Sequence, residues 1–188
     1  MKKIVCLLLC LFMIPACSKT PQCQHEHTTT NYEVSGLSIR KTVDCNDCEK
    51  QLEKKTVSKL KYVYNKVLLE DNGIKVTLLD ITVDGWDTVT MNCEIEGTTS
   101  SKRTFSLEKM FIDGYSANAW MYVSDLSDNR KDLSSDWLTD LKSTDFIKNQ
   151  SHEVEMDYTV IDSSSYRTLS EKSVKFNMNE YTVIEEVE

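Results

Sequence analysis

Hydrophobic and polar residues alternate with a period of two in several stretches of the chain after residue 63. In residues 88–96, one side of an extended strand would be apolar and carry Val89, Met91, Cys93 and Ile95. This pattern predicts a strand with one buried and one solvated face. The alternation recurs, with turn residues in between, in residues 74–78, 153–160 and 174–178. Such strands at short intervals predict a mainly β fold over residues 63–180, an immunoglobulin-like antiparallel β-sandwich.

One short helix is expected within this β region. Ser134 or Ser135 can cap residues 136–142, where the acidic side chains come early and the lysine comes late. This order favours a helix, because its N-terminus carries a partial positive charge and its C-terminus a negative one. We expect the helix to close one end of the sandwich.

Residues 32–62 predict a small β-hairpin module in front of the sandwich. Residues 32–43 have the character of one strand, and Cys45-Asn46-Asp47-Cys48 follows as a turn. The charged residues 49–61 fit a short helix and a strand equally well, so both interpretations stay open. The acidic residues 181–188 are expected to form a C-terminal tail.

The first 16 residues predict a secretion signal. Two lysines follow Met1, an apolar run covers residues 4–14, and small residues precede Cys17. The run has eleven residues, and at about 1.5 Å each these reach about half of the roughly 30 Å hydrocarbon core of a bilayer. The segment is therefore expected to be removed rather than to remain as a transmembrane helix.

The segment Ile14-Pro15-Ala16-Cys17 resembles the bacterial lipobox. This resemblance implies cleavage after Ala16, a diacylglycerol on Cys17 and often a further acyl chain, and two or three chains hold a protein durably on a membrane. Ordinary secretion, with Cys17 as a free or bridged cysteine, is the alternative. We expect an extracytoplasmic protein, lipid-anchored to the cell membrane or to an outer membrane if the host has one. The polar residues 17–31 would form its tether.

The charge of the mature chain restricts its partners. Removal of residues 1–16 takes away Lys2 and Lys3 but no acid, which leaves 172 residues with 20 basic and 30 acidic side chains, a formal charge of −10. Nucleic acids and anionic lipid surfaces are therefore poor partners. Five glycines, two prolines and 40% hydrophobic residues in the full chain also exclude a disordered or fibrous protein.

Four of the seven cysteines remain after maturation and lipidation, namely Cys23, Cys45, Cys48 and Cys93. Cysteines two residues apart present both sulfurs to one metal ion, and a Cys-x-His pair can complete a tetrahedron. Cys45 and Cys48, with Cys23 and either His25 or His27, would thus form a Cys3His site for one structural zinc. The pattern resembles Cys-x-His…Cys-x-x-Cys modules of Firmicutes surface proteins, although Glu49 stands where those modules carry a glycine.

Disulfides are an equally open interpretation of the same cysteines. Outside the cytoplasm Cys45 and Cys48 can be oxidised together, or Cys23 can bridge to one of them. Redox catalysis is less well supported, because no thioredoxin-like βαβ context surrounds the Cys-x-x-Cys sequence. The fate of Cys93 separates the interpretations: zinc leaves it as a lone thiol on the inward face of its strand, whereas two disulfides require a partner for it.

Aromatic residues and one histidine are the remaining candidates for chemistry. Core packing is the usual role of such aromatics, and a ligand platform is the alternative for Trp86, Trp120, Tyr122 and Trp137. Trp120 and Tyr122 are the best binding candidates, because they share parity just after a turn. His152 is expected to be a lone surface histidine, and no nucleophile motif lies beside it. We therefore expect no enzymatic activity.

Three segments of the β region are similar to a family of surface proteins of gut Firmicutes, namely residues 67–77, 110–118 and 158–166. That uncharacterised family occurs on lipoproteins and zinc-ribbon proteins and is taken to be an immunoglobulin-like sandwich of the extracellular DUF4352 type. The resemblance implies a fold and a surface location but no catalytic residues. The expected function is a non-enzymatic binding or structural module of the cell envelope, with an envelope protein or a glycan as partner. A zinc or thiol module carried on a sandwich is the alternative, and an unrecognised enzyme is the third hypothesis.

Overall fold

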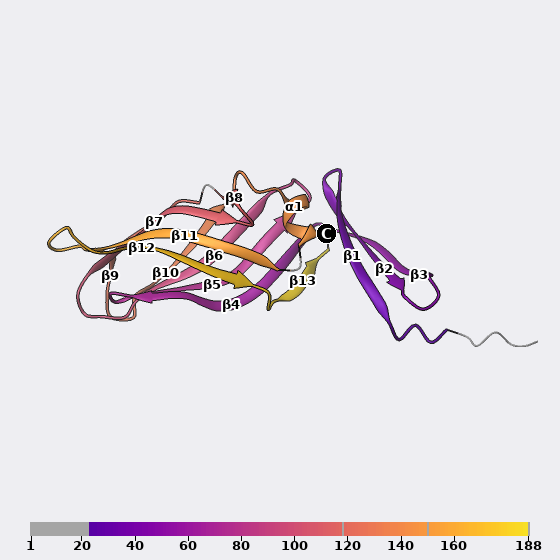
Figure 1. The fold of residues 1–188 in the computed structure, drawn as a ribbon, viewed down its shortest axis with the longest axis horizontal. Coiled ribbons are helices and arrows are strands. Elements are labelled where there is room, and N and C mark those ends of the chain that lie inside the picture. Colours follow the sequence, from indigo (N-terminus) through magenta and orange to yellow (C-terminus); the bar gives the residue numbers. More distant parts are fainter. Residues whose placement is uncertain (1–22, 118, 150, 188) are drawn as a thin grey trace, which may run out of the picture.

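The structure, a computed structural model, describes residues 23–117, 119–149 and 151–187. The predicted signal segment and Cys17 lie outside these residues. The described residues form three antiparallel sheets and one short helix, which confirms the predicted mainly β sandwich (Figure 1). In chain order the elements are β1 (Thr28–Ser35), β2 (Ser38–Cys45), β3 (Gln51–Val57), β4 (Lys59–Asp71), β5 (Ile74–Asp84), β6 (Val89–Gly97), β7 (Arg103–Ile112), β8 (Tyr115–Ser116), β9 (Met121–Leu126), β10 (Lys131–Trp137), α1 (Ser143–Lys148), β11 (His152–Asp162), β12 (Arg167–Met178) and β13 (Thr182–Glu186).

Two five-stranded sheets face each other and form the sandwich (Figure 1). One has the strand order β10-β6-β5-β4-β13, and the other has the order β12-β11-β7-β8 with β9 also paired to β7. The alternation in β6 is confirmed, since Val89, Met91, Cys93 and Ile95 are all buried in the core between the sheets. Phe105, Leu107 and Val160 of the facing sheet belong to the same core. Apolar burial on this scale is the main force that holds the two sheets together.

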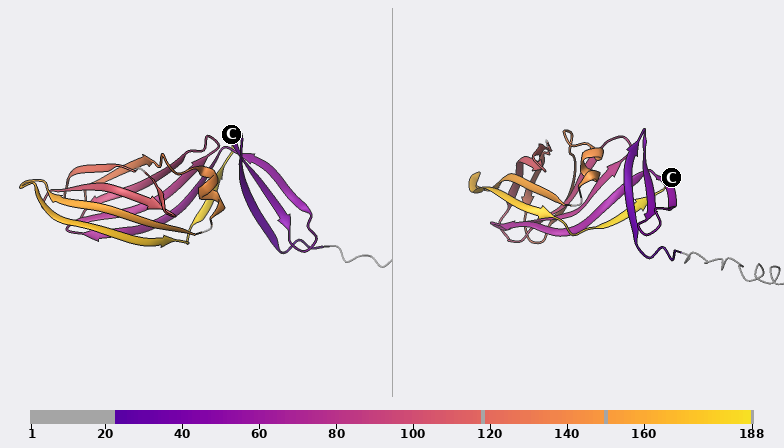
Figure 2. Two further views of the ribbon diagram at one scale, coloured as in Figure 1. Left: turned by 45° about the horizontal axis from the view of Figure 1, so that its top comes forward. Right: turned by 45° about the vertical axis from the view of Figure 1, so that its right-hand side comes forward.

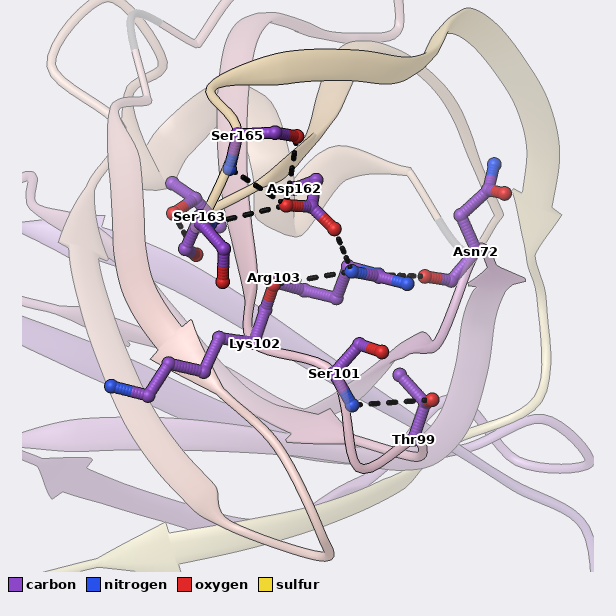
Figure 3. Close-up of polar contacts among 10 residues, drawn as sticks. Asn72, Thr99, Ser101, Lys102, Arg103, Asp162, Ser163 and Ser165 are labelled. Atoms are coloured by element: carbon purple, nitrogen blue, oxygen red, sulfur yellow. Dashed lines mark hydrogen bonds and ion pairs between the residues drawn. The ribbon is translucent and has the colours of Figure 1, made fainter.

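Arg103 ties the two sheets together at the end of the sandwich far from β1–β3 (Figures 1 and 3). Its Nη1 donates to Asp162 Oδ2 at 2.6 Å, and its Nε donates to the carbonyl oxygen of Asn72 at 3.1 Å. Asp162 also accepts the backbone N–H groups of Ser164 and Ser165. One guanidinium thereby joins the β4–β5 turn of one sheet to the β11–β12 turn of the other, a geometry suited to its fixed fork of donors.

The predicted helix over residues 136–142 is wrong. Lys131–Trp137 forms β10, which pairs with β6 and places Ser134 opposite Cys93. The ladder continues as Leu138 donates its N–H to the carbonyl of Val89 at 2.9 Å, and the Leu138 side chain is buried. The helix lies further along, at Ser143–Lys148. Pairing with an open sheet edge thus outweighs a local capping signal.

The N-terminal segment also differs from the predicted hairpin. The expected strand over residues 32–43 is two strands, β1 and β2, joined by a turn at Gly36, whose φ of +68° suits glycine. β1 begins at Thr28, so the last residues of the expected 17–31 tether pair with β2 instead. The charged segment left open between helix and strand forms β3 and the start of β4. We call residues 23–57 the N-terminal module.

Both expected boundaries of the sandwich shift. β4 runs through the expected border between residues 62 and 63, so the chain enters the sandwich at Lys59. The predicted acidic tail over residues 181–188 contains β13, which pairs with β4 and so forms an edge of the first sheet. Tyr181 and Val183 pack against the core. Acidic composition suggested solvation, but the alternate apolar residues of this segment are sufficient for an edge strand.

The module packs against one end of the sandwich and extends away from it (Figures 1 and 2). Ile39 and Val57 are buried in the core cluster of the sandwich. A Cβ placed on Gly85 would lie 2.3 Å from the carbonyl carbon of Leu37, so the β1–β2 turn sits directly on the β5–β6 turn. Any side chain at position 85 would push the two parts apart.

Glu185 of β13 joins the two parts electrostatically. Its carboxylate accepts a hydrogen bond from Tyr32 Oη at 2.6 Å and pairs with Lys55 Nζ at 2.5 Å and Lys41 Nζ at 2.9 Å. Burial alone would raise the pKa of this carboxyl, but the contacts with Lys55, Tyr32 and Lys41 outweigh it and lower the pKa to about 2. The negative charge of Glu185 therefore stabilises the junction.

Candidate functional site

Three cysteines and one histidine of the module converge on one point. The ligand atoms of Cys23, His25, Cys45 and Cys48 all lie within 4.8 Å of one another. Cys23 Sγ is 3.4 Å from Cys45 Sγ, and Cys48 Sγ is 3.6 Å from His25 Nδ1. A tetrahedral zinc ion with Zn–S bonds of about 2.3 Å and Zn–N bonds of about 2.0 Å spaces its ligand atoms by about 3.5–3.8 Å. The Cys3His group therefore has dimensions suited to such a metal ion.

Backbone hydrogen bonds hold the Cys-x-x-Cys turn in place. Cys45, the last residue of β2, pairs with Thr28 at the start of β1. The N–H of Asn46 donates to His27 O, and the N–H of Glu49 donates to Cys45 O, both at 2.9 Å. These bonds bring the chain around Cys23 and His25 next to the turn that carries the other two cysteines.

Glu49, just after this turn, has a φ of +58°. That left-handed conformation is the one in which glycine is least strained. A glutamate at this position therefore keeps the turn at the cost of local backbone strain.

The thiols of Cys23 and Cys45 in the cluster differ in pKa. The hydrogen bond from His25 is the main cause that lowers the pKa of Cys45, to about 6. The backbone N–H of His25 lowers the pKa of Cys23, but the contact with Cys45 and burial outweigh it and raise that pKa to about 11. Contact with His25 thus favours the thiolate of Cys45, and thiolates are the form in which cysteine binds metals.

The structure distinguishes between the two histidines that the sequence left open. His25 belongs to the ligand group, whereas His27 does not. The His27 side chain is 73% exposed, and its Nδ1 lies 3.3 Å from Asp47 Oδ2. Residues two apart on an extended segment share a face, so spacing alone did not separate them.

Cys93 lies apart from this cluster, in the core of the sandwich. Its side chain is buried on the inward face of β6, as predicted, and burial raises the pKa of its thiol to about 12. The four cysteines of the described residues are all free thiols. Cys93 is therefore a lone apolar thiol without a cysteine partner in the described chain, the arrangement expected if the other three bind a metal.

The four aromatic candidates are all exposed, and core packing is wrong for each of them. Trp120 and Tyr122 stack on each other with ring centroids 6.3 Å apart and planes at 13°. Tyr122 lies opposite Ser106 in the sheet that contains β7. Trp86 and Trp137 belong to the other sheet, at the β5–β6 turn and the end of β10. The structure thus divides the aromatics into two separate pairs.

His152 is buried, so the expected surface position is wrong. Its Nδ1 lies 2.7 Å from Asp113 Oδ2, and its ring stacks on Phe146 with centroids 3.9 Å apart. Asp113 also accepts hydrogen bonds from the Asn149 side chain and the backbone N–H of Glu153. This cluster joins α1 to the start of β11. The sequence signal for this cluster was the dipeptide Asp113-Gly114, which is typical of a turn. In the structure Asp113 has a φ of +53°.

His152 Nε2 is buried without a hydrogen-bond partner in the described part of the chain. A general base needs that nitrogen within reach of a substrate proton. The buried pair therefore acts in packing rather than at a surface site.

Comparison of the chain with known protein families, characterised proteins and solved structures finds no match. The similarity to Firmicutes surface domains therefore stays a prediction. Among the described residues, no helix has the length and apolarity needed to cross a bilayer.

Proposed function

We propose that this protein is a lipid-anchored, extracytoplasmic protein of the cell envelope whose N-terminal module binds one structural zinc ion. The convergence of Cys23, His25, Cys45 and Cys48 within 4.8 Å carries the zinc proposal. Three sulfurs and one imidazole nitrogen form a closed tetrahedral set of the kind that zinc prefers at structural sites. The sandwich acts as a non-enzymatic binding or structural domain of the envelope.

The small apolar core of the module supports a structural role for the metal. Of its residues only Ile39, Cys45 and Val57 are buried, and most side chains of β1 and β3 are exposed. Units below about 40 residues rarely fold through hydrophobic burial alone and generally need a metal, disulfides or a partner. With four protein ligands no coordination position is left for a substrate, so the zinc would supply folding energy rather than catalysis.

The location of the cluster is consistent with a metal site close to the membrane. Cys23, His25 and the Cys45–Cys48 turn lie at the end of the module where the chain leads back toward Cys17, six residues before Cys23. The β1–β2 turn at the opposite end contacts the sandwich. A metal at this point would stabilise the end of the N-terminal module that is nearest to the lipid-bearing Cys17 in the chain.

Metal content of the intact protein tests the zinc proposal. Native mass spectrometry should find one zinc per chain, and cobalt substitution should give the thiolate-to-metal absorption of a tetrahedral sulfur site. Cys48→Ser and His25→Ala should abolish stoichiometric binding. His27→Ala is the matched control and should retain it, because His27 lies outside the ligand group. A metal-free protein in which Cys23, Cys45 and Cys48 are found in disulfides would contradict the proposal.

The lipid anchor is tested separately. The mature protein should begin at Cys17 with the mass of a diacylglycerol and up to one further acyl chain, and it should fractionate with membranes. Cys17→Ser should release it into the soluble fraction without altering its zinc content, because position 17 is not a metal ligand. An unmodified Cys17 in the mature protein would disprove the anchor and leave the metal proposal standing.

A further inference from the structure

A groove of about 430 Å³ lies on the outer face of the β10-β6-β5-β4-β13 sheet, with Trp86 and Trp137 in its lining. Its floor follows the cross-strand rows of the sheet: Trp137 stands opposite Thr90, and Thr90 stands opposite Thr82. A groove of this volume falls within the range of small-ligand sites. It is remote from the metal cluster, which lies at the far end of the module.

The two indoles remain largely in solvent. Trp86 is 71% exposed and Trp137 is 68% exposed, although tryptophan is highly buried on average. An indole offers a large, rigid, apolar face and one N–H donor at little conformational cost. Two of them on one groove suit a ligand with flat apolar faces and hydrogen-bonding edges, as pyranose rings have.

The lining of the groove includes residues whose hydroxyl groups can bond to a ligand. The hydroxyls of Thr88, Thr90 and Ser135 line the groove, and none of them has a hydrogen-bond partner within the described residues. The Asn92 amide beside them is held in one orientation, because its Nδ2 donates to Asp80 Oδ1 at 2.6 Å. Its carbonyl oxygen stays available as an acceptor. These donors and acceptors match the hydroxyl groups of a sugar chain.

The charged groups of the groove are already engaged. Asp84 Oδ1 accepts the backbone N–H groups of Trp86 and Thr88, both at 3.0 Å. Lys59 Nζ lies 3.9 Å from Glu186 Oε2. The groove therefore presents a nearly neutral surface on a chain of formal charge −8, which repels polyanions.

From the exposed indoles, the free hydroxyls and the paired charges, we infer that this groove binds a neutral polysaccharide. The sugar rings stack on Trp86 and Trp137 while their hydroxyls bond to Thr90, Ser135 and Asn92. This inference specifies the binding role proposed for the sandwich but is independent of zinc binding and of the lipid anchor. Sugar binding at this groove and loss of metal at the module are therefore separable experimentally.

Affinity electrophoresis of the purified full-length protein, in a detergent without a sugar headgroup, tests the inference. Native gels contain β-glucan, galactomannan or arabinoxylan as neutral chains and polygalacturonate as the anionic comparison. At least one neutral polysaccharide should retard the protein, and polygalacturonate should not. Trp86→Ala and Trp137→Ala should each weaken the interaction roughly tenfold or more, as expected for central aromatic contacts. Thr90→Val, which keeps the shape but removes the hydroxyl, should weaken it a few-fold.

Trp120→Ala and Tyr122→Ala are the matched controls, because these side chains are also exposed but are absent from the lining of the groove. Tyr122 lies on the sheet that contains β7, and Trp120 stacks on it. They should leave retardation unchanged. Circular dichroism and the melting temperature should be unchanged in all variants, since each altered side chain is at the surface. The inference is overturned by the absence of retardation in every neutral gel, by retardation that persists without Trp86 and Trp137, or by retardation in polygalacturonate alone. A dimer in light scattering that Trp137→Ala dissociates would likewise overturn it, because a second copy would then cover the groove.

Discussion

The N-terminal module and the sandwich are both antiparallel β-structures, but they are held together differently. The sandwich buries two apolar sheet faces against each other, with a core that includes Phe105, Leu107 and Ile95. The module is a single three-stranded sheet whose few buried side chains belong to the shared core or to the metal cluster. A lone sheet of this size has no second layer on which to bury a face. The module packs on the sandwich at one end, and the zinc ion that we propose would stabilise it at the other.

This difference means that the two parts should respond separately to changes in metal, junction and pH. The core of the sandwich contains no member of the metal group. The module in turn contacts the sandwich through Ile39 and Val57 in the shared core, through the turn at Leu37 and through the Glu185 ion pairs.

Removal of zinc should unfold the module while the sandwich stays folded. Zinc binding contributes on the order of 10 kcal/mol to the folding of small zinc modules, whereas the sandwich has its own apolar core. Hydrogen exchange with and without a strong chelator should show loss of amide protection in β1–β3 and unchanged protection in β5 and β6. Full protection of β2 in the chelated protein would contradict the comparison, and joint loss in β2 and β6 would show a single cooperative unit.

Gly85→Ala should separate the module from the sandwich without disturbing the metal. The added methyl group would lie 2.3 Å from the backbone of Leu37, which cannot rotate away as a side chain can. Overpacking of this kind costs about 1–3 kcal/mol. Hydrogen exchange should rise at the β1–β2 turn, while the cobalt absorption of the cluster is retained. Gly114→Ala is the control: the added methyl meets open space but the φ of +79° disfavours alanine, so it adds backbone strain away from the junction and should leave β1 and β2 unchanged.

Acid should weaken the junction through Glu185. The folded pKa of Glu185 is about 2, below its ordinary value of 4.5, so its stabilisation is complete above pH 4.5 and is lost as the pH falls toward 2. The loss should be on the order of 1.5–3 kcal/mol, the value of hydrogen bonds to a charged group.

Denaturant unfolding of wild type and Glu185→Gln across this pH range measures the effect. The difference between the two proteins cancels the protonation of the metal ligands, which occurs in both. It should be largest above pH 4.5 and shrink toward pH 2. A difference that is independent of pH would show that the carboxylate charge does not hold the junction.

Glu49→Gly should strengthen the metal module slightly. Glycine relieves the left-handed strain at φ +58°, and after the entropy cost of glycine in the unfolded chain the net gain should be about 0.5–1 kcal/mol. Competition with a chelator should then show a two- to fivefold rise in zinc affinity, by the relation of about 1.4 kcal/mol per factor of ten. A lower affinity would show that the Glu49 side chain has a role of its own at the turn.

Some features of the candidate sites could be predicted from short stretches of sequence. The spacing of Cys45 and Cys48 placed both sulfurs on one turn, and the preceding Cys-x-His segment supplied the other ligands. Other features could not, because they depend on which segments meet. The choice of His25 over His27, the burial of His152 against Phe146 and the pairing of Trp86 with Trp137 all join residues from different elements.

For strands with a clear alternation, such as β6, the sequence by itself determined the strand and its apolar face, because a strand repeats every two residues and burial follows that local pattern. It also indicated which cysteines and histidines of the module are candidate metal ligands. Tertiary structure decided what each strand would pair with. Residues that were expected to be helical form β10 because they pair with the open edge of β6. The acidic C-terminal segment forms β13 because it pairs with β4. Such pairings join positions far apart in the chain, so their energy appears only once the sheets have assembled.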